Sequence, residues 1–399
     1  MAPTDATGRV RAPEGADRGG RRRVPAWVVL GAAVLAIASI AAAWALLAPS
    51  PADEGEAELL RHAGAAGGPI EFRSEEHVRD TLDQVDRAFG QHGPGPDPAP
   101  QRLAALGMLG TVLRLDGAAS VPAVQAFYLR RITDAVAEMR VTTVDAGALV
   151  WKMYNHGFVV RTRSVTLCFD LVRPNYLADF ALPRELMKAI VEQCDVLFLS
   201  HAHADHVESF VARTFMEQEK PVVAPGQIGF RGPLEAYVTR LERRADKEHR
   251  LPVRRGQHAL RVVAFPGHQG PDIDNNVVLV TTGEGIGVAH TGDQWDRFGD
   301  FAWMDRIGAR HRVDILLPNG WAWNIARMVR GFDPALVIPG HEYELGHSVA
   351  KRQSYALSFQ RRTGSAHFGG SARRGYDQPM VALAWGERFH YRPAGPGAR

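Results

Sequence analysis

The sequence feature that most constrains the fold is the polar motif His201-x-His203-x-Asp205-His206, which lies just after an uncharged apolar run. That run, Val196 to Leu199, has the length and composition of a buried strand, so the motif occupies the turn that follows the strand. Neutral imidazole and carboxylate groups are ligands that divalent first-row metals prefer. The motif therefore predicts a metal site on a loop with a rigid strand behind it. A histidine-rich surface loop is the alternative, and it predicts no further ligands downstream.

Three later positions do supply further ligands, each after an apolar run and beside glycine. His268 lies between Gly267 and Gly270, Asp293 follows Gly292, and His341 follows Gly340. Because glycine has no side chain, the backbone can approach a crowded centre closely at each of these turns. The recurrence of one arrangement along the chain favours a metal site over a surface loop.

On these residues the chain resembles the metallo-β-lactamase-fold hydrolase superfamily, over about residues 147–345. The resemblance rests on the order of features along the chain: the motif comes first, followed by His268, Asp293 and His341. Asp170 also matches an acidic position that usually lies behind the ligands. The resemblance implies an α/β fold, a four-layer αββα sandwich with a two-metal site at one edge. The region around Asn155-His156-Gly157 and the spacing after His268 are most similar to the lactonase and phosphodiesterase-like branches.

The resemblance also implies how the ligands divide between two ions. One metal would be held by His201, His203 and His268, the other by Asp205, His206 and His341, and Asp293 would bridge them. Asp205 would also act in catalysis by orienting a hydroxide that bridges the metals and attacks an ester, lactone or phosphodiester bond.

We therefore predict an enzyme, a metal-dependent hydrolase with two divalent metal ions. The histidine-rich ligand set favours Zn²⁺, with Mn²⁺ or Fe²⁺ as alternatives. A non-hydrolytic di-iron redox or metal-sensing module on the same fold is the alternative function. The redox branch typically has an acidic residue where this chain has His203, which favours hydrolysis.

Several neighbours of the motifs are weaker candidates. His290 is a candidate for contact with the ligands, and Tyr343 or His347 for polarising a substrate or protonating a leaving group, although packing explains each equally well. Glu342 is expected to be solvated and His156 to be structural. Four tryptophans either line an apolar substrate pocket or pack in the core: Trp295, Trp303, Trp321 and Trp323.

The N-terminal region contains an uncharged stretch from Val24 to Ala48. It is longer than the roughly 20 apolar residues that span a bilayer core. Arg21–Arg23 precede it and acidic residues from Asp53 follow it, which predicts a cytoplasmic N-terminus. We expect residues 24–48 to be a single-pass anchor in the cell membrane with the catalytic domain extracytoplasmic. A cleaved signal peptide, whose apolar core would be about 7–15 residues, and a buried soluble helix are the alternatives.

The remaining chain divides by composition and periodicity. We expect helices from Ser74, over Gln101–Leu115 and from Ser120, and another over Leu234–Asp246. The predicted divisions are a disordered basic cytoplasmic arm (1–23), the transmembrane anchor (24–48), a linker (49–73), a helical accessory segment (74–140), the metallo-β-lactamase-fold domain (141–387) and a loose tail (388–399). The accessory segment would pack against the main domain or space it from the membrane.

Charge and cysteine content limit the partners. The formal net charge is only +3 over 399 residues and the arginines are scattered, so no nucleic-acid partner is expected. The expected partners are a small-molecule or lipid-derived substrate and the membrane, while the oligomeric state is not defined. Cys168 and Cys194 are expected to be reduced, because strands aligned at the site would offset them along the sheet by several residues of about 3.3 Å each.

Overall fold

The computed structural model describes residues 74–177, 180–230, 232–254, 257–295, 298–322, 324–364, 367–368, 371–372 and 375–393. The predicted basic arm, membrane anchor and linker lie outside these residues. Within the described ranges, no helix combines the length and the apolar character that crossing a membrane requires.

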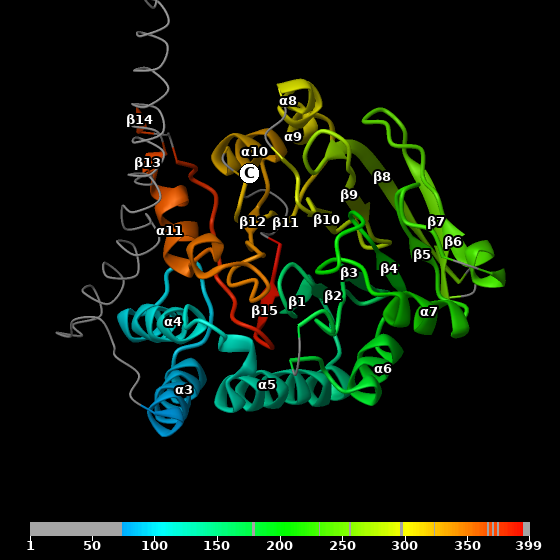
Figure 1. The fold of residues 1–399 in the computed structure, drawn as a ribbon. Helices are drawn as coiled ribbons and strands as arrows, with labels where there is room; N and C mark the ends of the chain where they lie inside the picture. Colours follow the sequence, from blue (N-terminus) through cyan, green and yellow to red (C-terminus); the bar gives the residue numbers. More distant parts are fainter. Residues whose placement is uncertain are drawn as a thin grey trace, which may run out of the picture. The chain divides into compact units, whose positions relative to one another are not determined.

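Two mixed β-sheets form the centre of the fold (Figure 1). The first has the strand order β15-β1-β2-β3-β4-β5-β6, antiparallel from β15 to β3 and parallel from β3 to β6. Its strands are β1 (Ala148–Lys152), β2 (Phe158–Arg161), β3 (Thr166–Phe169), β4 (Val196–Phe198), β5 (Val222–Val223), β6 (Val238–Thr239) and β15 (Arg388–Tyr391).

The second sheet has the order β12-β11-β10-β9-β8-β7. Its strands are β7 (His249–Val253), β8 (His258–His268), β9 (Asp274–Thr281), β10 (Gly287–His290), β11 (Ile315–Leu317) and β12 (Leu336–Val337). The strands β10, β11 and β12 are parallel, so the loops after them leave the sheet at the same edge. The short strands β13 (His367–Phe368) and β14 (Ser371–Ala372) pair only with each other.

The two sheets pack face to face around one apolar core. Phe169 and Phe198 of the first sheet pack in this core with Val262, Val280 and Ile315 of the second. The alternate residues of the same strands face outward, as the period of two in a β-strand requires. In β3, for example, Cys168 belongs to a different core on the outer face.

Helices cover the outer face of each sheet (Figure 1). The first sheet is covered by α3 (Glu75–Gln91), α4 (Pro100–Leu113), α5 (Pro122–Val141), α6 (Arg184–Glu192) and α7 (Ser209–Glu217). The second is covered by α8 (Phe298–Met304), α9 (Ile307–Arg310) and α10 (Ile325–Phe332), while α11 (Tyr355–Thr363) lies against α4 and α10. These layers form the predicted αββα sandwich.

The predicted accessory helices belong to this same sandwich. The Ser74 side chain accepts a hydrogen bond from the His77 N–H and caps α3, as expected. Pro122 is the first residue of α5, two positions after the expected start at Ser120. The apolar sides of α3, α4 and α5 share a core with Trp151 of β1. Packing against the main domain is therefore the observed role of residues 74–140.

Two predicted segments differ from the structure. The expected helix over Leu234–Asp246 is wrong: a 3₁₀ turn (Pro233–Tyr237) leads into β6, whose β-branched Val238 and Thr239 extend the parallel edge of the sheet. Residues 388–391 of the predicted loose tail form β15 and pair with β1. The Tyr391 hydroxyl donates to the Asp314 carboxylate at 2.8 Å, which holds the strand in place.

The prediction of reduced cysteines is also wrong, because Cys168 and Cys194 form a disulfide with a Cα–Cα distance of 6.2 Å. The expectation treated Cys194 as a straight extension of β4. Instead, Cys194 lies in the turn between α6 and β4, which connects the helix layer to the first sheet. Both cysteines belong to the core on the outer face of the first sheet. Because Cys194 does not continue the line of β4, the predicted offset along the strands does not apply to it.

Candidate metal centre

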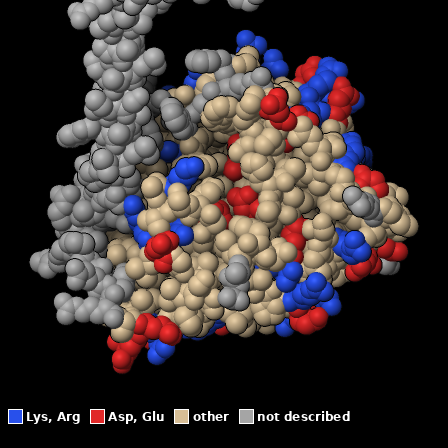
Figure 2. Space-filling model, viewed as in Figure 1, with Lys and Arg blue, Asp and Glu red and all other residues tan. Residues whose placement is uncertain are grey.

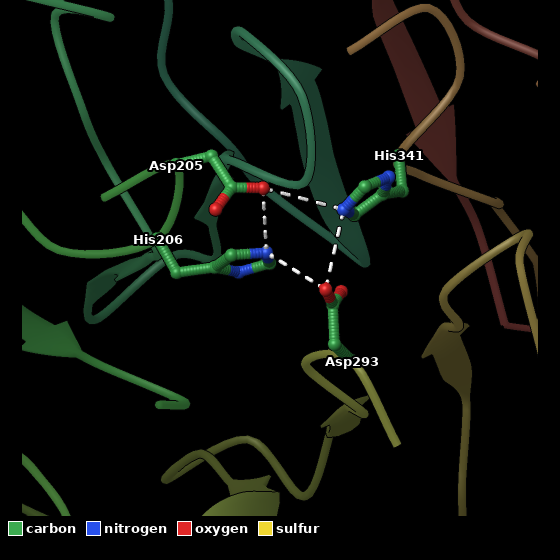
Figure 3. Close-up of side chains that lie close together, drawn as sticks. All are labelled: Asp205, His206, Asp293 and His341. Atoms are coloured by element: carbon green, nitrogen blue, oxygen red, sulfur yellow. Dashed lines mark ion pairs between the residues drawn. The ribbon is translucent and has the colours of Figure 1, made fainter. Parts of the chain in front are cut away.

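The loops after β4, β10 and β12 bring four predicted ligands together (Figure 3). Asp205 and His206 come from the first loop, Asp293 from the second and His341 from the third. The Nε2 atom of His206 lies 3.3 Å from an oxygen of each aspartate. The Nε2 atom of His341 lies 3.4 Å from Asp205 and 3.3 Å from Asp293.

A second group joins the first through Asp293. His201, His203 and Asp293 each present a donor atom within 4.8 Å of the others. The His201 Nε2 atom lies 3.8 Å from Asp293. The structure thus brings six of the seven predicted ligands into two groups that share the aspartate predicted to bridge.

The donor atoms of these groups fit a divalent metal. The Nε2 atoms of His201, His206 and His341 are buried and make no well-aligned hydrogen bond among the described residues, although those of His206 and His341 lie 3.3 to 3.4 Å from carboxylate oxygens. A buried polar atom without a partner costs free energy, and such an atom needs an explanation in a native fold. Convergent imidazole and carboxylate donors give that explanation, because they match the preference of Zn²⁺ and related ions.

Burial and charge set the protonation of the metal-free histidines in opposite directions. Burial lowers the pKa of His201 to about 3, and the nearby His206 adds to the effect. Burial also opposes a charge on His341, but Asp293 and Asp205 outweigh it and raise its pKa to about 10. The same two carboxylates raise the pKa of His206 against the effect of burial. Without a metal, protons on His206 and His341 therefore balance the aspartates.

Asp170 orients the motif from behind, which is the position that the resemblance implies for it. Its carboxylate accepts hydrogen bonds from the Ser200 N–H at 2.8 Å and the Ser200 hydroxyl at 2.5 Å. It also lies 2.7 Å from Nδ1 of His206, which directs Nε2 of that ring toward the centre. Ligand histidines are commonly held by a carboxylate in this way.

Two asparagines hold the carboxylates, and no sequence motif points to this role. The Asn155 side chain donates to Asp205 at 2.9 Å, and the Asn319 side chain donates to Asp293 at 2.9 Å. Asn155 has φ of 53°, a left-handed conformation that asparagine adopts more readily than most residues. The Asn319 amide binds one oxygen of Asp293 and leaves the other to face the centre, whereas the Asn155 amide binds the same Asp205 oxygen that faces His206 and His341.

His268 lies beside these groups but is not part of either. Its Nδ1 atom lies 3.1 Å from both oxygens of Asp300, and the Gln294 side chain donates to the same carboxylate at 2.8 Å. Nδ1 is therefore the protonated nitrogen, and Nε2 remains available to a metal. Asp300 lies on α8, far along the chain from His268, and sequence reasoning missed it.

His156 and His290 form a buried pair beside the centre, with ring centroids 4.2 Å apart. His290 donates from Nε2 to the His156 carbonyl at 3.0 Å and accepts the Gly292 N–H at Nδ1. Together with Asp170 they form a third group of closely spaced donor atoms. Because both His290 nitrogens and the Asp170 carboxylate already have partners, packing is the role that the geometry favours.

The three candidate residues that follow His341 differ in their burial and in their contacts. The expectation that Glu342 is solvated is wrong, since it is fully buried in an ion pair with Lys152. Tyr343 is buried in the core, with its ring 5.2 Å from that of Tyr355. His347 is half-buried and stacks on Trp321 at 4.8 Å, so of these residues it lies nearest to the cavity described next.

A cavity of about 290 Å³ opens at Asp293. Trp321 also stacks on the predicted ligand His341, and Trp295 is 49% exposed. The lining residues are Gln269, Gly270, Pro271, Asp293, Gln294, Trp295, Asn319, Trp321 and Ala322. Figure 2 shows acidic atoms in a hollow near the middle of one face, bordered mostly by uncharged residues. Of the other predicted pocket tryptophans, Trp303 packs elsewhere and Trp323 lies outside the described residues.

No model of a known protein family matches the sequence, and no curated protein matches it. Similar solved structures include Igni18, a metallohydrolase of Ignicoccus hospitalis, which is 16% identical with a TM-score of 0.42 over 61% of this chain and 99% of that chain. A Thermotoga maritima protein named as a Zn-dependent hydrolase of the metallo-β-lactamase superfamily is 14% identical, with a TM-score of 0.33 over 59% and 100%.

A third similar structure is CmlA, a diiron β-hydroxylase of Streptomyces venezuelae. It is 14% identical, with a TM-score of 0.38 over 63% of this chain and 55% of that chain. At these TM-scores the site residues, rather than the named neighbours, carry the functional conclusion.

Proposed function

We propose that this chain is a dinuclear metal-dependent hydrolase of the metallo-β-lactamase superfamily. The observation that carries the proposal is the pair of donor groups that share Asp293. Three buried imidazole nitrogens in these groups make no well-aligned hydrogen bond among the described residues. The first metal would be held by His201, His203, His268 and Asp293, and the second by Asp205, His206, His341 and Asp293.

Two divalent ions in such a site lower the pKa of a shared water and polarise the bond under attack. The chain itself supplies orientation and exclusion of bulk water. Asp205 is fixed by Asn155 with one oxygen facing the centre, so it can accept a proton from the attacking water. Asn319 fixes Asp293, and Asp170 fixes His206, so the donors need no rearrangement before the reaction.

The cavity next to the centre suggests the class of substrate. Trp295 and Trp321 present apolar ring surface, whereas Gln269, Gln294 and Asn319 present polar groups. An ester, lactone or phosphodiester whose reacting group lies at Asp293 and whose apolar part lies against the tryptophans fits this lining. A lipid-derived substrate agrees with the predicted membrane anchor at residues 24–48.

The proposed location is the outer side of the cell membrane. The Cys168–Cys194 disulfide supports it, because disulfides persist in oxidising compartments and are rare in the cytosol. Protease added to intact cells should then digest the catalytic domain. Protection of that domain from protease would contradict this topology.

Metal analysis combined with a substrate panel tests the proposed function. We expect about two zinc ions per chain and hydrolysis of lactones, phosphodiesters or lipid-derived esters. Asp205→Asn should abolish turnover, whereas Asp305→Asn, which alters an exposed ion pair, serves as the matched control and should not. Two irons per chain with oxygen consumption would instead favour the redox alternative, and activity only on β-lactams or thioesters would refute the substrate class.

A further inference from the structure

A second cavity, of about 300 Å³, lies between the second sheet and its helices and shares no lining residue with the cavity at the metal centre. Its floor is aromatic. Phe265 of β8 and Trp303 of α8 stack with ring centroids 5.1 Å apart and an interplanar angle of 14°. Phe265 is almost fully buried, so Trp303 is the ring of this pair that offers a flat apolar surface to a planar ligand.

The rim of this cavity carries two exposed arginines. Arg306 precedes α9 and Arg310 is its last residue, and neither forms an ion pair with a described residue, although the charge of Arg310 helps to lower the pKa of the Asp246 carboxyl. The lining contains one acidic residue, Asp246, and both of its oxygens already accept hydrogen bonds from Arg244. Two neighbouring guanidinium groups match a carboxylate, which they can bind through paired hydrogen bonds.

A third feature points to a ligand with an acceptor atom. The indole Nε1 of Trp303 is buried and has no hydrogen-bond partner among the described residues. A buried N–H in that state costs free energy, and a ligand oxygen would satisfy it. The cavity volume lies at the lower end of the range for small-molecule sites, so it suits a ligand of about one ring.

We propose that this cavity binds a small aromatic carboxylate, with its ring on the Phe265–Trp303 floor and its carboxylate at Arg306 and Arg310. The ligand is selected by the combination of a flat apolar ring surface and two neighbouring guanidinium groups at the rim. A neutral ligand of the same shape can stack on the aromatic ring but forms no ion pair with Arg306 or Arg310.

The position of the cavity makes it a regulatory site for the metal centre, a role that rests on the proposed function. The floor residues lie three positions from a pair that orients a ligand: Phe265 and His268 in β8, Trp303 and Asp300 in α8. Asp300 holds Nδ1 of His268 at 3.1 Å. A ligand that moves α8 against β8 therefore changes the direction of His268, which couples anion binding to metal binding.

NMR titration of the zinc-loaded, ¹⁵N-labelled protein with benzoate tests the site. Benzoate should shift the indole resonance of Trp303, identified by its loss in Trp303→Phe, and should bind at least about tenfold more tightly than benzyl alcohol. Arg306→Gln combined with Arg310→Gln should weaken benzoate binding about tenfold or more. The matched control is Arg261→Gln, which changes an exposed arginine of β8 paired with Glu248, and it should leave the affinity unchanged.

Equal affinity for benzyl alcohol, an unchanged affinity in the double variant, or a shift confined to the Trp321 indole at the metal centre would overturn the anion site. Coupling is tested separately, since saturating benzoate must change zinc affinity by the same factor by which zinc changes benzoate affinity. If neither ligand changes the affinity for the other, the regulatory role is overturned and the anion site is not. Failure of the hydrolase assignment would leave the benzoate titration unaffected.

Discussion

Asp170 lies 2.7 Å from Nδ1 of His206, and both side chains are fully buried. The contact joins the residue that follows β3 to the motif that follows β4, two parallel neighbours in the first sheet. Because the strands are hydrogen-bonded side by side, the aspartate approaches the back of the imidazole rather than its metal-facing nitrogen. The direction of His206 is thus set by the sheet.

Loss of this contact should weaken metal binding without removing a ligand. In Asp170→Asn the ring of His206 loses its charged partner, and we expect metal affinity to fall about 10- to 100-fold. Competition with a chromophoric chelator measures the change. Asp305→Asn provides the surface control, and an affinity equal to that of the parent protein would show that Asp170 does not orient the ligand.

The sharing of Asp293 predicts different metal contents in two variants. Asp293→Ala removes a donor from both groups and should reduce binding to well under one tightly held ion per chain. His341→Ala removes a donor from one group only and should retain about one ion. Elemental analysis after dialysis distinguishes them, and two retained ions in both variants would contradict the assigned groups.

Metal uptake should release protons and strengthen as pH rises. Burial opposes the charge on His341, but Asp293 and Asp205 raise its pKa to about 10, so its ring is protonated at neutral pH in the metal-free protein. A metal can bind Nε2 only after that proton leaves. Calorimetry in two buffers of different ionisation enthalpy should show net proton release, and uptake of protons would contradict the prediction.

The raised pKa of His341 also makes the stability of the metal-free protein depend on pH. A group whose pKa is higher in the folded than in the unfolded state stabilises the fold fully below its ordinary value, here 6.5, and loses that contribution as pH rises toward 10. Thermal unfolding of metal-free protein should therefore show falling stability over this interval. Metal-loaded protein is the control, since its ligand nitrogens no longer titrate.

Arg352 should be important for stability although it lies outside the metal groups. Its guanidinium donates to the carbonyls of Leu113 and Leu115 at the end of α4, and to those of Leu345 and His347 after the ligand His341. Arg352→Met leaves these acceptors without their donor and should lower the free energy of unfolding by about 3 kcal/mol.

Urea denaturation of the metal-loaded protein measures this change. The control is Arg327→Met, which disrupts an exposed pair with Asp305 and should cost less than about 1 kcal/mol. Similar losses in the two variants would show that the buried arginine has no special role in joining α4 to the loop.

Removal of the disulfide should destabilise the fold. Cys168 and Cys194 are separated by 26 residues, and closing a loop of this length in the unfolded chain corresponds to about 3 kcal/mol. We expect Cys168→Ala with Cys194→Ala to lower the free energy of unfolding by this order, with the fold retained. Alkylation before and after reduction checks the bond, and free thiols in protein isolated under non-reducing conditions would refute it.

The sequence determined the local parts of this protein. His201, His203, Asp205 and His206 were recognisable because ligand chemistry and strand–turn spacing are both local properties. The same holds for the start of α3 at Ser74, whose side chain caps the helix as predicted, and for the polar residues that follow β10 and β12.

Only the tertiary structure decided which distant groups meet. Asn155, Asn319 and Asp300 orient predicted ligands, yet the sequence pattern assigned this role to none of them. The burial of Glu342 against Lys152 and the cysteine pairing likewise join residues from different elements. Such contacts depend on the stacking of the sheets and on where each turn leaves them, and the side-chain pattern of a single segment carries no information about either.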